Sequence, residues 1–420
     1  MPDLKRHWHR IARHQGLKNT GYLTVGQAIS QGISLVGAFY IPRLLGPEQY
    51  GIYQSALAYV ALFTIFTMTG LSRVMTRECA QRIKESRKII ESLVGLANFF
   101  SLTATLLSIG LVFLIGYDHV LQIYIVIFSF SLLFKGLGVS INSIFESHED
   151  FKNLALILCL QNSLLVIGSI IIIKIGYGVM TLILFRLVLE LAMLLFKYRI
   201  SRRHLIFNPW TGVKIIKKYI RPGINFSLLG FMNFLSGRVD LVMLSLLATP
   251  KQVGIYALAY RIVQKGLIMR RSIAQGFFPR YAKKFKEGGI KTRMLWRHTL
   301  FILIPSLLVI ILTLLGSEYV IVNIVGTAYS DSVAIINLLV VFLILRYLCL
   351  PWALYLQTGG HERLLVYAGA LAGLLNISLN LIFFKLYGVV GIAYSTLVVE
   401  GLRLLGVLFL VKARTISEQI

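Results

Sequence analysis

The sequence has few acidic side chains, few cysteines and little charge of any kind. Charged residues make up 14% of its 420 positions, against about a quarter in soluble domains. Only 17 residues are Asp or Glu, whereas 43 are Lys or Arg. Three scattered cysteines, Cys79, Cys159 and Cys349, indicate neither a disulfide framework nor a metal cluster. These shortages argue against a soluble domain.

Motifs of catalysis and nucleotide binding are also missing. The chain contains no Gly-x-x-x-x-Gly-Lys-Ser/Thr phosphate loop, no His-Glu-x-x-His and no Gly-x-Ser-x-Gly. ATP-driven export by this chain alone is therefore not expected. We predict that the protein is not an enzyme and has no catalytic residues, metal site or cofactor, although H+ or Na+ could serve as a coupling ion.

Hydrophobic residues are what the sequence has in excess. They form 57% of the chain, and the mean hydropathy is +0.76. Apolar runs of roughly 18 to 25 residues recur, which is enough for a helix to cross a bilayer. The first run lacks a small-residue cleavage signature, so we expect it to be retained. Twelve spans are predicted: 21–41, 53–71, 93–115, 119–141, 154–173, 179–196, 223–247, 254–270, 299–315, 333–357, 364–384 and 389–411.

Two sequence echoes indicate an internal repeat. Pro47-Glu-Gln-Tyr-Gly-Ile-Tyr53 returns 203 positions later as Pro250-Lys-Gln-Val-Gly-Ile-Tyr256, and Tyr177-Gly-Val179 returns after 210 positions as Tyr387-Gly-Val389. Separations of about half the chain favour two similar halves. Six spans in each half make the repeats parallel, with an axis along the membrane normal. We predict an all-α integral membrane protein with two six-helix bundles, 1–200 and 222–420, joined by a basic linker, 201–221.

The basic residues lie mainly in alternate loops between the spans. Loops on the side that holds both termini contain 32 Lys and Arg, against 4 on the opposite side. The positive-inside rule therefore places both termini in the cytoplasm, and the two Pro-x-Gln-x-Gly-Ile-Tyr loops outside. This placement explains the net charge of +26 without nucleic-acid binding, which we do not expect.

Ionisable residues within the spans are the candidate functional residues, because charge in a membrane is costly. Arg238, Asp240, Arg261 and Lys265 flank Pro250. Arg261 and Lys265 are four apart and share a helix face, and Asp240 lies at a depth similar to that of Arg261. One interpretation is a cavity in which the cations hold a phosphate-bearing head group and Asp240 orients an arginine. The other is an interhelical ion pair, with Lys265 extending to the headgroups.

Other polar residues in the spans are second-rank candidates for the cavity. Lys135 and Arg346 have no obvious partner in the sequence, whereas Arg186 with Glu190, and Glu400 with Arg403, have the helical spacing of ion pairs. Gln27 with Gln31, and Asn376 with Asn380, form polar stripes that suit either sugar hydroxyls or bonds between helices. The tyrosines Tyr50, Tyr53, Tyr256 and Tyr329 are interpreted as an interfacial aromatic belt.

The first span, together with the stretch from Pro42 to Tyr53, resembles the start of the polysaccharide transporters. These are the Wzx-type O-antigen flippases of the multidrug/oligosaccharidyl-lipid/polysaccharide (MOP) flippase superfamily. The corresponding second half is resembled by Val239 to Tyr256, Asn376 to Asn380, and Gly388 to Thr396. The resemblance implies a MATE-like, V-shaped pair of six-helix bundles and alternating access. It also implies movement of undecaprenyl-diphosphate-linked oligosaccharide to the outer leaflet.

We therefore expect a multi-pass protein of the bacterial inner membrane that flips an O-antigen or other surface-polysaccharide repeat unit. Its partners would be the lipid-linked oligosaccharide, membrane lipids and other polysaccharide assembly proteins. One alternative is a multidrug or cation exporter of the same superfamily, which would be expected to have buried acids. Another is a membrane glycosyltransferase or polymerase, for which Glu146, Glu149 and Asp150 form the only acidic cluster.

Overall fold

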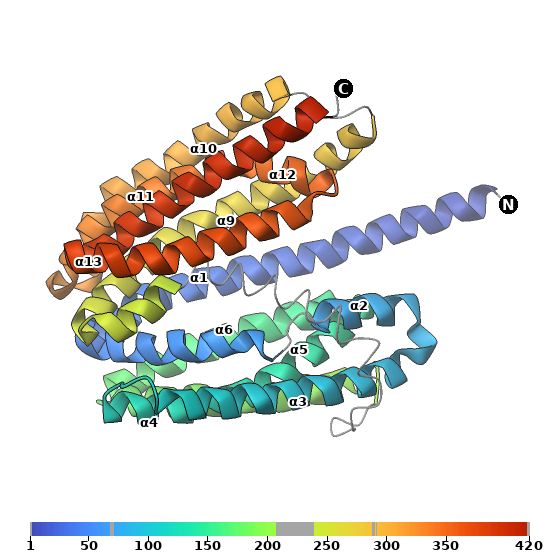
Figure 1. Ribbon diagram of the computed structural model, residues 1–420. Coiled ribbons are helices and arrows are strands. Elements are labelled where there is room, and N and C mark those ends of the chain that lie inside the picture. Colours follow the sequence, from blue (N-terminus) through green and yellow to red (C-terminus); the bar gives the residue numbers. More distant parts are fainter. Residues whose placement is uncertain (1, 68–70, 207–238, 288–289, 291, 418–420) are drawn as a thin grey trace. The chain divides into compact units, whose positions relative to one another are not determined.

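The computed structural model describes residues 2–67, 71–206, 239–287, 290 and 292–417 (Figure 1). Within these ranges the regular structure is helical throughout. Among the described residues, eight helices are long and apolar enough to cross a membrane, and two of them contain a break in helical geometry. The predicted all-α, multi-pass membrane architecture is thus confirmed. Because most of the span 223–247 lies outside the described residues, the number twelve stays a prediction.

The chain divides into two compact units, which we describe separately. Unit 1 comprises residues 1–44 and 59–231. In its described part, α5 contacts the helices α2, α3, α4, α6 and α7. The elements are α1 (Pro2–Leu62), η1 (Phe63–Ile65), α2 (Leu71–Gln81), η2 (Ile83–Glu85), α3 (Ser86–Val112), α4 (His119–Ser129), α5 (Ser131–Ser147), α6 (Phe151–Lys174) and α7 (Val179–Ser201).

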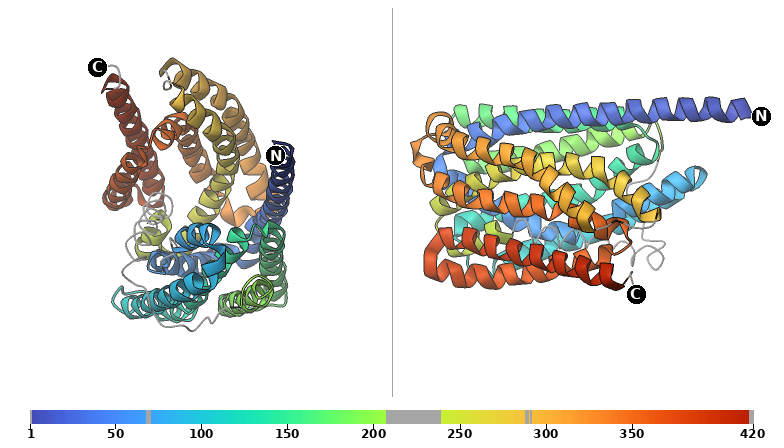
Figure 2. Two further views of the ribbon diagram at one scale, coloured as in Figure 1. Left: turned by 90° about the vertical axis from the view of Figure 1, so that its right-hand side faces the viewer. Right: turned by 90° about the horizontal axis from the view of Figure 1, so that it is seen from above.

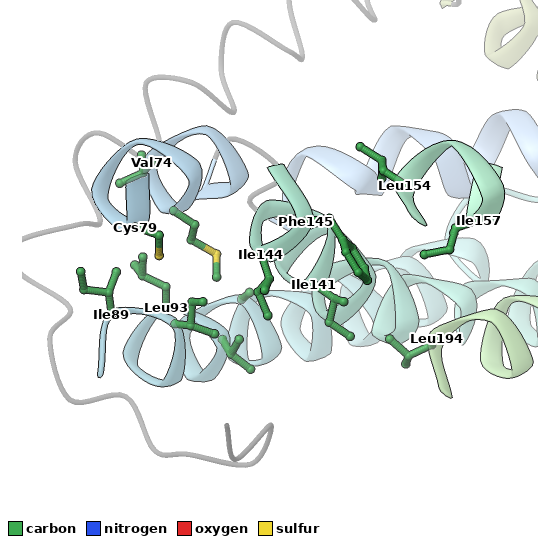
Figure 3. Close-up of a cluster of buried hydrophobic side chains, with 14 of the residues drawn as sticks. Val74, Cys79, Ile89, Leu93, Ile141, Ile144, Phe145, Leu154, Ile157 and Leu194 are labelled. Atoms are coloured by element: carbon green, nitrogen blue, oxygen red, sulfur yellow. The ribbon is translucent and has the colours of Figure 1, made fainter. Parts of the chain in front are cut away.

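A buried apolar cluster fills one end of unit 1 (Figure 3). Val74 and Cys79 of α2 face Ile89 and Leu93 of α3, with Ile144 of α5 beside them. Burial raises the pKa of the Cys79 thiol to about 12, so this cysteine is an inert part of the core. The amphipathic helix α2 therefore packs against α3 and α5.

Unit 2 comprises residues 45–58 and 232–420, so the segment that carries the first repeat motif groups with the second half. The expected division into 1–200 and 222–420 does not include this exchange. In unit 2, α11 contacts α9, α10 and α13, as α5 contacts its neighbours in unit 1. The elements are α9 (Pro250–Lys286), α10 (Thr292–Tyr319), η3 (Val320–Val325), η4 (Thr327–Tyr329), α11 (Asp331–Leu348), α12 (Leu350–Thr358) and α13 (Glu362–Ser417).

Glycines break the two longest helices. Gly46 in α1 has φ 74°, and Gly388 in α13 has φ 61°, a left-handed region that other residues rarely adopt. The two arms of α13 on either side of Gly388 lie side by side in every view (Figure 2, orange and red). Each glycine therefore turns one continuous run of helix into two spans.

The two copies of the repeat motif touch each other within unit 2. A β-carbon added to Gly51 would overlap the carbonyl oxygen of Pro250, and one added to Gly254 would overlap that of Pro47. The second copy begins at a capping box in which Thr249 and Gln252 bond each other's backbone. The repeated motif thus marks the place where the first turns of two helical segments cross. Only glycine allows the two backbones to come this close there.

Helix α9 is longer than its predicted span of 254–270, since it continues to Lys286. The basic segment after 270 was expected to be a loop. Phe277 and Tyr281, which are four residues apart, continue an apolar stripe along this extension. Tyr281 is fully buried and its hydroxyl lies 2.8 Å from Nδ1 of His298 at the start of α10. Packing against α10 therefore outweighs the local excess of charge.

Candidate functional site

Asp240 is buried, with 3% of its surface exposed. Its Oδ1 accepts a hydrogen bond from Asn380 Nδ2 at 3.0 Å. Its Oδ2 accepts from the hydroxyls of Thr396 at 2.8 Å and Tyr256 at 3.1 Å. These partners are uncharged, so among the described residues the carboxylate is held by dipoles. Because Arg238 lies outside the described residues, the expected contact of Asp240 with an arginine stays a prediction.

The asparagines beside Asp240 carry further oxygens in the same interior. Asn376 and Asn380 are 2% and 0% exposed, and within the described part of the chain neither Oδ1 has a hydrogen-bond partner. A carboxylate with neighbouring amide and hydroxyl oxygens has the donor set that hard cations prefer. We call Asp240, Tyr256, Asn376, Asn380 and Thr396 the Asp240 cluster.

The sequence placed Asp240 and the asparagine stripe in separate groups, and the structure brings them together. Asn380 is 140 residues away from Asp240, and Thr396 is 156 residues away. Nothing in the spacing reveals such contacts. Thr396 and Tyr256 were not predicted as site residues, although both stand in stretches that carry the family resemblance.

Arg261 and Lys265 lie on α9, one turn apart and partly buried. Arg261 Nη1 donates a hydrogen bond to the hydroxyl of Tyr50 at 3.3 Å. Tyr50 belongs to the first repeat motif, and its ring packs edge-on against Tyr329 at 6.4 Å. Because a hydroxyl is neutral, this bond fixes the guanidinium of Arg261 without neutralising its charge. Arg238 lies outside the described residues.

Arg346 has a partner that the sequence did not indicate. Its Nη2 lies 2.6 Å from Oε1 of Glu400, while Arg403 Nη1 is 3.6 Å from the same oxygen. Arg270 Nε donates to the backbone carbonyl of Arg346 at 2.9 Å. Three arginines thus gather around one nearly buried glutamate. The predicted pair of Glu400 with Arg403 is confirmed, but the shorter contact is to Arg346.

The remaining candidates lie in unit 1. Gln27 and Gln31 of α1 are both exposed. Lys135 of α5 lines a cavity between α5, α6 and α7, and its Nζ lies 5.9 Å from the centre of the Phe128 ring. The predicted pair of Arg186 with Glu190 is confirmed at 3.9 Å.

The four tyrosines expected to form an interfacial belt are buried. Tyr50 and Tyr256 are 0% exposed, Tyr53 is 5% and Tyr329 is 1%. The interpretation as a belt is therefore wrong. These side chains sit where the repeat motifs cross, and the hydroxyls of Tyr50 and Tyr256 contact Arg261 and Asp240. Buried tyrosine hydroxyls usually find such a partner.

The acidic cluster between α5 and α6 makes structural contacts. Asp150 caps α6 by accepting from the backbone of Asn153, and it lies 2.5 Å from His204 Nε2. Burial opposes ionisation, but the hydrogen bonds from Asn153 and His204 outweigh it and hold the pKa of Asp150 below its usual value. Glu146 accepts a hydrogen bond from Thr76. Asp150 and Glu146 therefore have hydrogen-bond partners within the protein, as expected for a structural connector.

The described residues contain no group of three or more His, Cys, Asp or Glu side chains placed to hold a metal ion. Residues 16–285 match the model of one family, described as polysaccharide biosynthesis protein. The chain belongs to this family. No curated protein sequence matches the chain.

Solved structures show which fold this family member has. The lipid II flippase MurJ, in an inward closed conformation, matches with a TM-score of 0.78 and 16% identity, over 93% of this chain and 87% of that one. An inward-facing multidrug resistance MATE family transporter of the MOP superfamily matches at 0.70 and 15%, over 93% and 98%. A MOP superfamily transporter from Pyrococcus furiosus matches at 0.62 and 13%, over 96% of both chains. The predicted MOP flippase fold is thus confirmed.

Proposed function

We propose that this polysaccharide biosynthesis family member is a flippase for undecaprenyl-diphosphate-linked oligosaccharide. It carries an O-antigen or other surface-polysaccharide repeat unit from the cytoplasmic to the outer leaflet by alternating access. The observation that carries the proposal is the positive face of α9. There, Arg261 is fixed by the neutral hydroxyl of Tyr50, and Lys265 lies one turn further on.

Such a face suits the chemistry of a diphosphate. A diphosphate is costly to move through low dielectric unless cations accompany it. Arg offers paired hydrogen bonds to phosphate oxygens, and Lys offers a compact charge. Because Tyr50 satisfies one guanidinium nitrogen without cancelling the charge, Arg261 keeps its attraction for an anion.

A coupling cation, H+ or Na+, fits the Asp240 cluster. The carboxylate could accept a proton, or it could bind a sodium ion together with the amide oxygens of Asn376 and Asn380, which have no hydrogen-bond partner among the described residues. Replacing Asp240 by Asn keeps the shape and removes the charge. If the cluster holds the coupling ion, the transport rate of Asp240→Asn no longer responds to a Na+ or pH gradient.

Charge placement supports the proposed orientation in a bacterial inner membrane. The Lys and Arg excess of 32 to 4 favours cytoplasmic termini. In this orientation α9 begins near the outer face and carries Arg261 and Lys265 inward. The basic extension of α9 to Lys286 then lies near the anionic cytoplasmic leaflet.

A multidrug or cation exporter is the main rival, because MATE transporters share the fold. Such a protein would be expected to use buried acids for cationic cargo. Here the oxygens of Asp240 accept three hydrogen bonds, Glu400 lies against Arg346, and Glu190 lies near Arg186. Two of these three acids are thus paired with arginines, which favours anionic cargo.

Reconstituted vesicles test the proposal. Fluorescent lipid-linked oligosaccharide is placed in one leaflet, and its appearance in the other is followed with a quencher that cannot cross. We expect rapid movement with the protein and none in empty vesicles. Movement of a cationic dye without movement of the lipid would favour the exporter. Formation of a new glycosidic bond from lipid-linked sugar would favour the glycosyltransferase or polymerase.

A further inference from the structure

Unit 1 contains a cavity of about 130 Å³ between α5, α6 and α7. We call it the α5–α7 cavity. Five polar side chains line it: Lys135, Asn142, Gln161, Glu190 and Lys197. The apolar cluster of unit 1 adjoins it, since Met193 and Leu194 belong to both. A polar chamber therefore sits directly beside a dry core.

Positive charge exceeds negative charge around the α5–α7 cavity. Two ammonium groups, from Lys135 and Lys197, share the wall with one carboxylate, Glu190. Glu190 is itself 3.9 Å from Arg186. A net positive charge inside a membrane helix bundle is costly and favours binding of an anion.

The position of Lys197 fits this interpretation. Its Nζ lies 4.0 Å from where a β-carbon of Gly138 would stand, so the ammonium rests against the glycine face of α5. Lys197 is four residues before the end of α7 at Ser201, about 6 Å along the helix. In the proposed orientation this end faces the cytoplasm. An anion arriving from the cytoplasmic leaflet would meet this lysine first.

The cavity has room for a small anion. A water molecule needs only about 10–15 Å³ of such space, so 130 Å³ can receive a phosphate group with its five heavy atoms. The amides can complete the site. Asn142 Oδ1 is buried and has no hydrogen-bond partner within the described chain, and rotation of the amide would present its NH2 to a phosphate oxygen.

The second half also has a cation and an acid at the corresponding positions, but there they form an ion pair. Arg346 stands 211 positions after Lys135, on the corresponding central helix, and Glu400 stands 210 positions after Glu190. In unit 2 the cation and acid meet at 2.6 Å. In unit 1 the corresponding lysine and glutamate both line the α5–α7 cavity. The same two positions thus form an internal ion pair in unit 2 and part of a cavity wall in unit 1.

We propose that the α5–α7 cavity binds a phosphate group, with Lys135 and Lys197 as the cationic ligands and Asn142 and Gln161 as hydrogen-bond donors. This inference rests on the proposed function, under which the phosphate belongs to the polyprenyl carrier. The cavity then captures the carrier separately from the α9 cations, Arg261 and Lys265.

Equilibrium binding of a radiolabelled polyprenyl diphosphate without sugar tests the site, using the full-length protein in phosphatidylcholine nanodiscs. Loss of one charge-assisted contact should weaken binding about tenfold or more in Lys135→Gln and Lys197→Gln. Asn142→Asp, nearly isosteric, should do the same by placing a negative charge in the cavity. Lys197→Arg should retain most of the affinity. Lys152→Gln, at an exposed position of the same unit, is the matched control and should bind as wild type does.

Competition identifies the source of the phosphate. Displacement by inorganic pyrophosphate supports the site with a soluble anion as occupant. Displacement by unlabelled polyprenyl diphosphate but not by pyrophosphate or phosphatidylglycerol supports it with the carrier as occupant. Wild-type dissociation constants in the well-folded Lys197→Gln and Asn142→Asp variants would overturn the inference. If such variants bind normally while the wild type flips its substrate, only this inference fails. If the wild type neither binds nor flips the lipid, the proposed function fails with it.

Discussion

At the scale of single residues, Glu400 is the acid whose negative charge is shared by neighbouring arginines. It is 4% exposed and lies against Arg346 and Arg403, while Arg270 bonds the backbone of Arg346. Removing one member of a buried ion pair leaves the other charge uncompensated, which costs far more than losing an exposed pair. Loss of the one acid here leaves several cations together.

We therefore predict an unequal response when either partner is neutralised. Glu400→Gln should lower the free energy of unfolding by about 3 kcal/mol or more. Arg346→Gln should cost less, because Glu400 keeps Arg403 at 3.6 Å and one repelling cation is gone. Denaturant unfolding in mixed micelles measures both values.

An exposed pair supplies the control for this comparison. Arg87 and Glu91 lie 3.1 Å apart on α3, with 63% of the arginine side chain accessible. Glu91→Gln should change the unfolding free energy by only about 0.5 kcal/mol or less. Equal losses for Glu400→Gln and Arg346→Gln would contradict the account of a shared acid.

Sequence reasoning at this scale finds partners one helical turn apart and little beyond. The pairs Arg186 with Glu190 and Glu400 with Arg403 were predictable from spacings of four and three. Arg346 was not matched with Glu400, because 54 residues separate them and only the packing of α11 against α13 brings them together. Asp240 was likewise matched with a cation, whereas its partners come from distant helices.

At the scale of elements, the two repeat motifs cross each other within unit 2. Gly51 faces Pro250 and Gly254 faces Pro47, so the two glycines are related by the internal repeat. The sequence predicted the repeat from its echoes. It could not predict that the copies touch, because similarity between two segments carries no information about their distance in space.

Alanine at either glycine should therefore disturb the fold in the same way. In Gly51→Ala and Gly254→Ala the new methyl group meets a backbone carbonyl, which cannot move aside as a side chain can. We expect each change to lower stability by about 1–3 kcal/mol, as overpacking commonly does. The readout is the thermal transition of the detergent-solubilised protein.

Gly406→Ala is the matched control for the crossing glycines. Gly406 lies within α13, and an added β-carbon would meet nothing within 4 Å. Alanine is the better helix former by about 1 kcal/mol, so this variant should be as stable as wild type or more so. Wild-type transitions for both crossing variants would refute the close contact.

At the scale of the whole molecule, composition and the lengths of the apolar runs were sufficient to predict an all-α membrane protein with two similar halves, and the resemblance to the polysaccharide transporters implied the MOP fold. Boundaries were less accurate, because α9 continues through a basic segment that packs against α10. The exchange of residues 45–58 into unit 2 also escaped sequence reasoning. Long apolar runs indicate which segments contact lipid. They do not indicate with which half of the protein a given helix packs.

The orientation can be tested by labelling introduced cysteines in intact cells. Cys79, Cys159 and Cys349 are first replaced by serine or alanine, and single cysteines are then placed at Lys84 and Lys251. Lys251 lies in the second repeat motif, which we expect to face outward, and Lys84 lies in a basic segment expected inside. A membrane-impermeant maleimide should label the variant at 251 only. Labelling at 84 without labelling at 251 would reverse the proposed orientation.

The central claim is that the cations of α9 carry an acidic lipid across the bilayer. It is tested most directly by flipping of lipid-linked oligosaccharide in vesicles that contain the double variant Arg261→Ala, Lys265→Ala. We predict loss of flipping at normal folding and reconstitution, with activity retained by the control Lys152→Gln. Wild-type flipping by the double variant would contradict the claim.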